Sequence, residues 1–382
     1  MPIKQTVVPG VPEDIQVFEL FTQSNSLSAR CINYGARLTH LMVPDKDGKY
    51  RDVLLGFDDP TDYVTVDAEK KTYFGATIGR TCNRITHGHF FLNNRDYNLP
   101  INDPPNNLHG GVRGFDKRYW RPTILVQDPP TLRFEYTSAD GEEGYPGEVH
   151  VSVTYTLAEY HLVIDHTASL TEGNPENLQT VINLTAHPYF NLSGCQEEPD
   201  VTEHIVEIPD AVGYLEVTEN KVPSGRLVRF DQGDPALNLT TPKPLREGLS
   251  QLTHFRGYDH FYLLRDKPAA ASPNQISNPA ARVTSPTTGI VLELRTDAAG
   301  FQLYTGNNLD GSISGKASSQ GDNVIYKRYA GLALEPSAPV DAVNHPPWRD
   351  TVVIGKGQEW RQSLIYGFST VQRRPSSGMW AV

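Results

Sequence analysis

The amino-acid sequence predicts an all-β fold, and two features of the chain support this expectation. Apolar and polar residues alternate along residues 149–157, beginning with Val149, Val151 and Val153 on one face, which is the period of a half-buried strand. The chain also contains 31 glycines and 29 prolines, which interrupt helices and place turns between strands. We therefore expect many short strands and few, short helices.

Further elements follow in chain order. A short helix is expected after Pro60. Two hairpins are predicted where apolar runs flank turn residues: residues 90–92 and 97–99 around residues 93–96, and residues 124–126 and 132–136 around residues 128–130. Residues 266–275 lack apolar periodicity and predict an exposed insertion, and residues 311–323 predict another mobile loop.

The 382 residues would allow two or three domains by length alone, although all-β folds often exceed the usual domain size. The sequence contains no charged run or Gly/Ser-rich linker that would separate folding units, and the candidate site residues come from both halves of the chain. We expect a single domain spanning residues 1–382.

The formal charge of -11 and the sequence pI near 5.5 bear on the class of partner. Without a run of Lys or Arg, this balance argues against nucleic acid or an anionic membrane and favours a neutral small molecule. The N-terminal residues lack the apolar region of a signal peptide, and no segment is long and apolar enough to span a bilayer. The expected location is the cytoplasm.

The three cysteines are too few and too scattered for a disulfide framework or a metal cluster. Cys31, Cys82 and Cys195 are therefore expected to be reduced thiols in a reducing compartment. Cys82 is interpreted as a small buried hydrophobic residue rather than a functional thiol.

Two histidines and one glutamate are the candidate catalytic residues. His187 lies among aromatic and amide residues, His109 precedes a Gly-Gly pair, and Glu335 follows an apolar run. Each lies where a strand-like segment meets a Gly- or Pro-rich loop, and together they have the chemistry of an acid-base device. Taken singly, Glu335 is more readily interpreted as a surface residue than as a catalytic one. His187 alone is as readily interpreted as a packed histidine as a catalytic one.

A series of motifs in one order along the chain resembles the aldose 1-epimerases, the galactose mutarotases. The motifs are NYGA at 33–36, YFGATIGR at 73–80, NRI at 83–85, NNLHGG at 106–111, DGEEGYPG at 140–147, NLTAHPYFNL at 183–192, GYDH at 257–260, QLYTGN at 302–307 and LE at 334–335. Their number and order make the resemblance specific. It implies a large antiparallel β-sandwich of the galactose mutarotase type, with a carbohydrate cleft across one sheet face.

The resemblance also implies an activity: interconversion of the α and β anomers of free hexopyranoses such as galactose or glucose. Such a reaction needs a base at the anomeric hydroxyl and an acid at the ring oxygen, with no metal or other cofactor. By resemblance Glu335 is the base, His187 is the acid, and His109 hydrogen-bonds the substrate near the ring oxygen. The expected partner is a small sugar, and the expected assembly is a monomer or a weak homodimer.

Four further residues are expected to bind sugar hydroxyl groups. By resemblance these are Asn83, Arg84, Asp259 and Gln302, whose amide, guanidinium and carboxylate groups suit that role. Three of them have a purely structural alternative: an ion pair for Arg84, turn capping for Asp259 and a solvated strand face for Gln302.

Several alternatives stay open. His87 and His89 resemble a metal pair, but no third ligand has a recognisable spacing, so a solvated strand face is expected. A related epimerase acting on hexose 6-phosphates would need a cationic pocket, for which Arg80, Arg84, Arg113 and Lys117 are the candidates. A catalytically silent sugar-binding module is the alternative from another class.

The chain departs from the family pattern at two positions near the candidate site. Ala186 replaces an Asn that commonly precedes the histidine, and Ser337 stands where a Gln is usual after the last motif strand. Each change removes an amide, so the preference among hexoses is expected to be affected.

Overall fold

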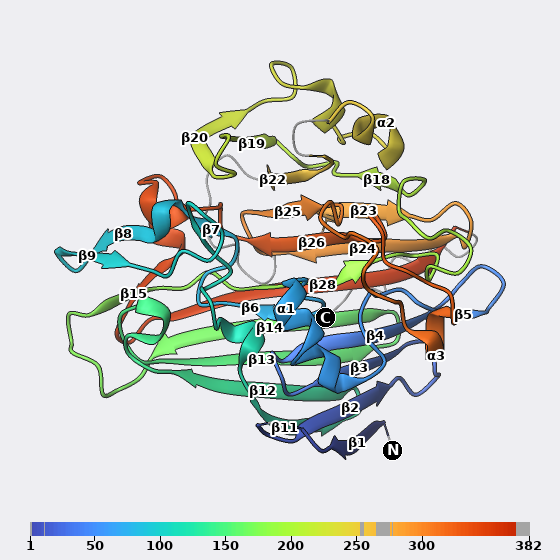
Figure 1. Cartoon of the computed structure of the whole chain (residues 1–382), viewed down its shortest axis with the longest axis horizontal. Helices are drawn as coiled ribbons and strands as arrows, with labels where there is room; N and C mark the ends of the chain where they lie inside the picture. Colours follow the sequence, from blue (N-terminus) through green and yellow to red (C-terminus); the bar gives the residue numbers. More distant parts are fainter. Residues whose placement is uncertain (1, 11, 253–255, 265–275, 277, 372–382) are drawn as a thin grey trace.

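The computed structural model describes residues 2–10, 12–252, 256–264, 276 and 278–371. Its strands form three large antiparallel sheets and four two-stranded sheets (Figure 1). The α-helices of the described part are single short turns: α1 (Val66–Lys70), α2 (Leu245–Leu249) and α3 (Ala317–Gln320). The predicted all-β class, a large antiparallel β-sandwich with few short helices, is confirmed.

One layer of the sandwich is a nine-stranded sheet. Its strands, in spatial order, are β11 (Arg121–Gln127), β12 (Pro130–Ser138), β13 (Val149–Ala158), β14 (His161–Leu170), β28 (Glu359–Thr370), β24 (Ile290–Thr296), β23 (Ala281–Thr284), β18 (Ile205–Glu207) and β21 (Lys243–Pro244). Strand β28, close to the C-terminal end of the described chain, lies between β14 and β24 in the middle of the sheet.

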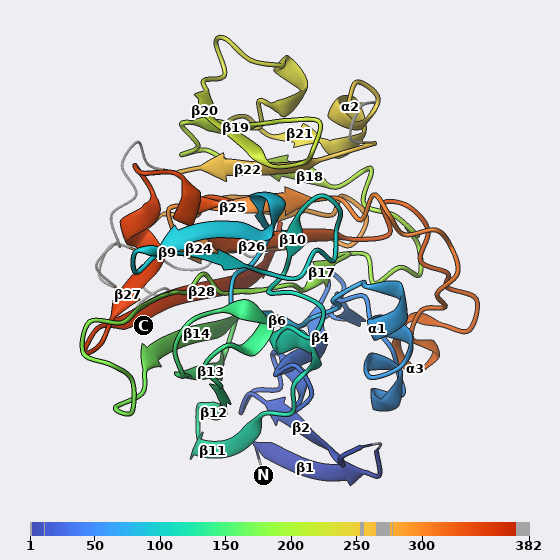
Figure 2. The ribbon, with the colours of Figure 1, turned by 60° about the vertical axis from the view of Figure 1, so that its left-hand side comes forward.

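The second layer consists of two sheets. The five-stranded sheet runs in chain order through β1 (Ile3–Val8), β2 (Ile15–Phe21), β3 (Ser28–Ile32), β4 (Arg37–Pro44) and β5 (Tyr50–Asp52). The six-stranded sheet has the order β17 (Tyr189–Phe190), β26 (Leu332–Ser337), β25 (Gly300–Tyr304), β22 (Asp259–Leu263), β19 (Gly213–Val217) and β20 (Pro223–Val228). Figure 2 shows β1 to β4 facing β11 to β14 in the lower half of the molecule.

The main hydrophobic core lies between these layers. Phe18 of β2 packs edge-on against Phe134 of β12 with ring centroids 5.9 Å apart, and Phe190 of β17 contacts Tyr366 of β28 at 5.0 Å. The strands alternate inward apolar residues with outward polar ones, as the pleat requires. Both layers therefore contribute one face to a common core.

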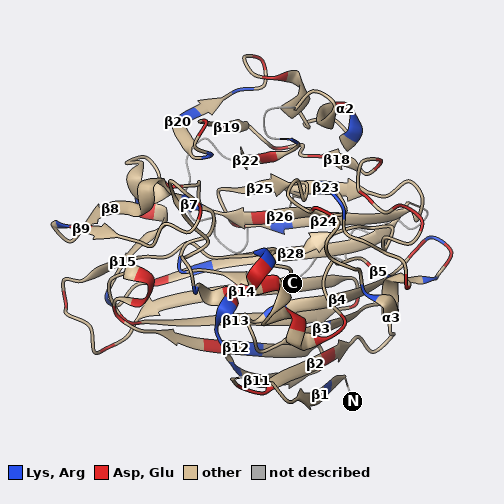
Figure 3. Cartoon of the chain, viewed as in Figure 1, with Lys and Arg blue, Asp and Glu red and all other residues tan. Residues whose placement is uncertain are grey.

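This alternation aims polar residues outward from the six-stranded sheet. Leu334, Leu303 and Tyr262 belong to the main core, whereas their neighbours along the strands point to the opposite face. Strands β22 and β26 each contain one acidic residue, Asp259 and Glu335, visible as red bands in Figure 3. The outward face of this sheet is therefore where the candidate site is built.

Four two-stranded sheets carry the remaining motif segments. They pair β6 (Thr77–Ile78) with β16 (Thr185–Ala186), β7 (Arg84–Ile85) with β10 (Asn107–Leu108), β8 (His89–Leu92) with β9 (Arg95–Asn98), and β15 (Gln179–Val181) with β27 (Val353–Gly355). Two of these pairs, β6 with β16 and β7 with β10, bring the His187 and His109 segments beside the motif at residues 73–85.

The predicted local elements are largely confirmed. Strand β13 covers the alternating segment, and both hairpins form, as β8 with β9 and as β11 with β12. A short 3-10 helix begins at Pro60, and α1 follows it. Residues 266–275 lie outside the described residues.

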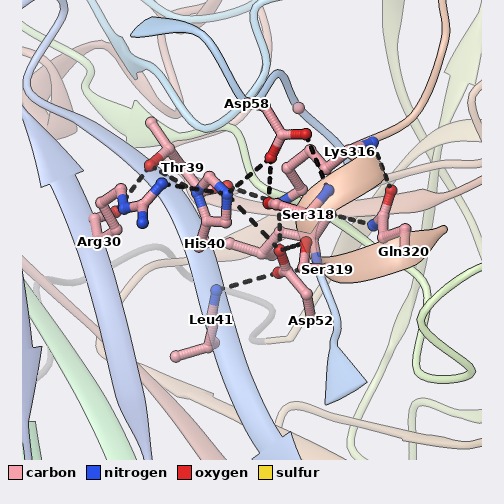
Figure 4. A network of polar contacts seen from close by, with 12 residues as sticks. Arg30, Thr39, His40, Leu41, Asp52, Asp58, Lys316, Ser318, Ser319 and Gln320 are labelled. Carbon is pink, nitrogen blue, oxygen red and sulfur yellow. Dashed lines mark hydrogen bonds and ion pairs between the residues drawn. The ribbon is translucent and has the colours of Figure 1, made fainter. Parts of the chain in front are cut away.

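The expectation of a mobile loop at residues 311–323 is wrong in one respect, because this segment contains α3 and is anchored by buried polar contacts (Figure 4). The Lys316 ammonium group is fully buried, lies 2.6 Å from Asp52 Oδ2 and donates to the carbonyl of Thr39. Gln320 Nε2 donates to the carbonyl of Leu54 at 2.7 Å. A buried ion pair and a satisfied amide fix the segment against β4 and β5.

Cys31, Cys82 and Cys195 are all free and buried. Burial raises the pKa of the Cys82 thiol to about 12, so this thiol is a poor nucleophile at neutral pH. The interpretation of Cys82 as a packed residue is confirmed. Among the described residues, no helix has the length and apolar character needed to cross a bilayer.

Candidate active site

His187 and Glu335 meet on the outward side of the six-stranded sheet. His187 lies between β16 and β17, and its backbone N–H donates to the carbonyl of Ala76 at 2.9 Å. Glu335 lies in the middle of β26. His187 Nε2 is 3.4 Å from Glu335 Oε1, and the residues are only 3% and 4% exposed. The two side chains are close enough to act on neighbouring atoms of one small ligand.

His109 is the third member of this cluster. Its backbone is in the left-handed region at φ 52°, just after β10, and its ring centroid lies 5.4 Å from that of His187. His109 Nδ1 accepts a hydrogen bond from the backbone N–H of Asn83 at 3.2 Å. Because Nδ1 is an acceptor, Nε2 carries the hydrogen of the neutral ring and is a donor for a bound oxygen.

Two tyrosines frame the histidines. The Tyr189 ring stacks on His187 with centroids 4.9 Å apart, and Tyr73 lies 6.1 Å from His187 and 4.7 Å from His109. These rings restrict the orientation of both imidazoles and exclude water around them.

A polar row extends from Glu335 across the sheet. Gln302 of β25 is the register partner of Glu335, and its Nε2 donates to Asp259 Oδ1 at 2.7 Å. The buried Gln302 Oε1 has no hydrogen-bond partner among the described residues. Because an unsatisfied buried acceptor is costly, this atom is suited to receive a ligand hydroxyl.

All four predicted substrate-binding residues, Asn83, Arg84, Asp259 and Gln302, line one pocket. The remaining lining residues are Leu215, Val217, Lys221, Pro223, Phe261 and Val340, so His109, His187 and Glu335 lie outside this lining. The six-stranded sheet lines the pocket with residues of β22, β25 and the β19–β20 hairpin.

The Arg84 guanidinium is already engaged on one side. Its Nε donates to Asp103 Oδ2 at 2.8 Å, and its backbone N–H donates to Asn83 Oδ1 at 2.9 Å. Both interpretations of Arg84 are therefore compatible, since the structural ion pair orients a side chain that also lines the pocket.

Burial displaces the ionisation of the central pair in opposite directions. It raises the pKa of Glu335 to about 8, with Asp259 adding to the rise and Arg84 opposing it. It lowers the pKa of His187 to about 4. Burial also lowers the pKa of His109 well below its usual value, and His187, Arg84 and Lys117 add to this effect. At neutral pH the pair of Glu335 and His187 accordingly holds one proton, and His109 is neutral.

The same cluster also has the residue types of a metal site. One ligand atom each from His109, His187 and Glu335 lie within 4.8 Å of one another. Ligands of a tetrahedral zinc site, with bonds of about 2.0–2.2 Å, are about 3.4 Å apart, so the side chains would have to converge before holding an ion. His89 instead pairs with Asp96 at 2.8 Å, and His87 lies in a 3-10 turn (Thr86–Gly88) rather than on the strand.

The two departures from the family pattern lie beside the pocket rather than in its lining. Ala186 belongs to the main core and is 1% exposed. Ser337 is buried and hydrogen-bonds the Cys82 thiol. These positions give little support to the expectation that they act on a sugar hydroxyl directly.

None of Tyr73, Tyr189 and Lys221 is among the candidate site residues named from the sequence. Tyr73 lies in the motif at 73–80, and Tyr189 lies in the motif at 183–192, two residues after His187. Their membership of these motifs could have identified them as site residues. Lys221 lies at the turn of a hairpin and outside every motif, so only the fold brings it to the pocket.

Comparisons with known proteins agree with this geometry. A family model described as aldose 1-epimerase matches residues 19–367. Galactose mutarotase of Rattus norvegicus is 37% identical over 368 residues, covering 96% of this chain and 98% of that protein. The galactose mutarotase of Homo sapiens is 38% identical over 362 residues, covering 95% and 96%.

A solved structure supports the same relationship. The GalM/aldose epimerase homologue from C. elegans superimposes with a TM-score of 0.77 at 25% sequence identity, covering 97% of this chain and 99% of that one. With the family model and the similar sequences, this shows that the chain belongs to the aldose 1-epimerase family.

Proposed function

We propose that this chain interconverts the α and β anomers of free hexopyranoses, with Glu335 and His187 transferring the protons. The observation that supports this most directly is the 3.4 Å approach of His187 Nε2 to Glu335 Oε1 in a buried site beside the polar row. The anomeric hydroxyl and the ring oxygen are both bonded to C1. A base and an acid that act on them must therefore converge on one carbon, as these two side chains do.

The reaction requires one proton to leave and one to arrive. In the carboxylate-imidazolium form of the pair, Glu335 takes the proton of the C1 hydroxyl while His187 protonates the ring oxygen. The bond between C1 and the ring oxygen breaks and an aldehyde forms. After rotation about C1–C2, ring closure on the other face returns both protons to their starting positions.

Burial favours the other protonation form, in which Glu335 is a neutral acid and His187 a neutral base. Both forms contain the same single proton and interconvert by transfer across the short contact. In the neutral form the roles are reversed: Glu335 is the acid and His187 is the base, and this is the form that carries out ring closure. One site with one mobile proton therefore serves both directions.

His109 and the pocket residues supply the remaining contacts. His109 Nε2–H is directed to stabilise an oxygen at C1, because Nδ1 is held by Asn83. Gln302 Oε1 and the Asp259 carboxylate accept hydrogen bonds from ring hydroxyls, and Asn83 and Arg84 donate them.

Free sugars suit the pocket better than hexose 6-phosphates. The Arg80 guanidinium is buried and donates to the carbonyls of Pro146 and Gly147, and Lys117 pairs with Asp116. Arg84 is paired with Asp103, and the pocket holds the Asp259 carboxylate beside Lys221, so its lining is not the cationic cluster that a phosphate requires. Rates with the free and the phosphorylated sugar distinguish these two reactions.

Polarimetry on freshly dissolved α-galactose and α-glucose tests the proposal. We expect the approach to the equilibrium rotation to be faster with the protein than without it. Sugar binding with no acceleration would instead identify a catalytically silent binding module.

The cellular setting is also proposed. Three buried, unpaired cysteines suit a reducing compartment, so we propose a cytoplasmic enzyme that works as a monomer or weak homodimer. Cell fractionation and sedimentation of the purified protein test these two points.

A further inference from the structure

The two proposed catalytic residues lie just past the end of a two-residue ladder, in which β17, two residues after His187, pairs with the start of β26. Strand β16, just before His187, pairs with β6. Strand β26 pairs with β17 only through Leu332 and Ala333, so the stretch of β26 around Glu335 has a strand partner, β25, on one side only among the described residues. This short ladder ends before it reaches the pair, so side-chain hydrogen bonds also bear on the 3.4 Å contact.

Gln362 of β28 occupies this gap from the opposite layer. Its Nε2 donates to the carbonyl of Leu184 at 3.1 Å and to the carbonyl of Pro336 at 2.9 Å. Leu184 is three residues before His187, and Pro336 directly follows Glu335. One amide group thus uses its two hydrogens on the two catalytic segments, and the residue is only 4% exposed.

We propose that Gln362 is a positioning residue that sets the distance between His187 and Glu335 by tying both segments to the nine-stranded sheet. Its amide hydrogens are directed to the backbone on either side of the pair, so it acts through the two segments rather than on the two catalytic side chains.

Neighbouring contacts support this role. The Asn183 side chain exchanges two hydrogen bonds with the backbone of Ala338, at 3.0 and 3.3 Å. The Tyr366 hydroxyl donates to the carbonyl of Leu334 at 3.1 Å. Gln362 differs from both, because Asn183 belongs to the His187 segment itself and bonds Ala338 just after β26, whereas Tyr366 contacts β26 alone.

Removing the Gln362 donors has a defined consequence. The buried carbonyls of Leu184 and Pro336 would lose their partners and seek others, by strand movement or by admitting water. Either response lengthens the contact between His187 and Glu335. Water in the site would also return both pKa values toward normal, lower for Glu335 and higher for His187.

The test rests on the proposed function and uses Gln362→Met, which keeps the length of the side chain and removes both donors. We expect kcat per folded molecule to fall about tenfold or more while KM changes less than about threefold. We also expect the pH range of full activity to narrow from both sides. Gln362→Asn keeps the amide but reaches at most one carbonyl, so an intermediate loss is expected.

Gln320→Met is the matched control. Gln320 is also a buried amide that donates to a backbone carbonyl, that of Leu54, but it lies in α3 within the network of Figure 4. We expect this variant to lose stability and to keep the wild-type kcat and pH profile per folded molecule.

Two results would overturn the inference: a Gln362→Met enzyme that loses only stability, as the control does, or Gln362→Asn with wild-type kcat. Failure of the proposed function looks different. In that case the wild-type protein would not accelerate anomer exchange, or Glu335→Gln would remain fully active.

Discussion

Glu335 and His187 are both buried, yet burial shifts their pKa values in opposite directions. A carboxyl group taken out of water holds its proton more tightly, whereas an imidazole holds it less tightly. The result is a pair with one mobile proton across the neutral range. The catalytic hypothesis can therefore be tested at each residue separately.

Glu335→Gln keeps the shape of the side chain but cannot exchange a proton. We expect kcat to fall about 10²-fold or more, the usual effect of removing a positioned acid-base group, while sugar binding stays measurable by calorimetry. His187→Asn should behave in the same way. Near-wild-type turnover of the Glu335→Gln variant in polarimetry would remove Glu335 from the mechanism.

The pH dependence of kcat/KM follows from the same pair. Below about pH 4 the pair gains a second proton, on His187, and above about pH 8 it loses its one proton, from Glu335. Activity should therefore be highest between these limits. The measurement is polarimetry over this range with the spontaneous rate subtracted at each pH. An alkaline limb near the ordinary glutamate value of 4.5 would contradict the burial of this carboxyl group.

Stability should also depend on Glu335. A raised pKa favours the folded state fully below the normal value of 4.5, and this contribution is lost as the pH rises toward 8. Gln does not titrate, so the variant lacks this pH dependence. The free energy of unfolding of Glu335→Gln, relative to that of the wild type, should therefore rise by on the order of 3–5 kcal/mol over this interval. Urea titrations at pH 4.5 and pH 8 measure the difference in unfolding free energy between the variant and the wild type. The same difference at both pH values would refute the prediction.

The β19–β20 hairpin is the element that completes the pocket. Leu215, Val217, Lys221 and Pro223 line it from this side, and the Asn106 side chain donates to the Asn220 carbonyl at 2.7 Å, which joins the hairpin to the segment before His109. The hairpin therefore brings Lys221 to a pocket that Asp259 and Arg84 also line.

Lys221→Ala should raise KM with little change in kcat, because Lys221 lines the pocket whereas Glu335 and His187 do not. One hydrogen bond of about 0.5–1.5 kcal/mol corresponds to a rise of about two- to tenfold. Lys243→Ala on β21 in the other layer is the control, with unchanged KM. A fall in kcat at constant KM would place Lys221 in the chemistry instead.

The segment that carries α3 makes a second element-level prediction. Lys316→Met leaves Asp52 buried without its partner, which should cost about 3–5 kcal/mol of stability. The activity of the folded fraction should persist, because the pair lies outside the pocket lining. Chemical denaturation measures the loss. A change below about 1 kcal/mol would show that the segment is not held by this contact.

The whole molecule is expected to unfold as one unit. The main core includes residues from Ile3 to Phe368 and draws on all three large sheets, so neither layer can keep its inner face covered alone. Circular dichroism, tryptophan fluorescence and loss of activity should give one coincident transition in urea. Separate transitions would divide residues 1–382 into more than one domain.

Much of this architecture is encoded locally. The alternation along β13 and the turn residues of the β8–β9 and β11–β12 hairpins act over a few residues, and these elements form as expected. The candidate site residues could be named because His109, His187 and Glu335 each lie in a recognisable motif. Local pattern and motif are properties of neighbouring residues, which a sequence displays directly.

Contacts between distant residues are not displayed in this way. The segment at 311–323 has the composition of a loop, yet Lys316 is buried because β4 and β5 bring Asp52 and Thr39 to it. Gln362 lies in no motif, and its two acceptors lie elsewhere in the chain, Leu184 just before β16 and Pro336 in β26. A side chain far along the chain acquires its partner only when the sheets pack, since burial then makes an unpaired polar group too costly to leave.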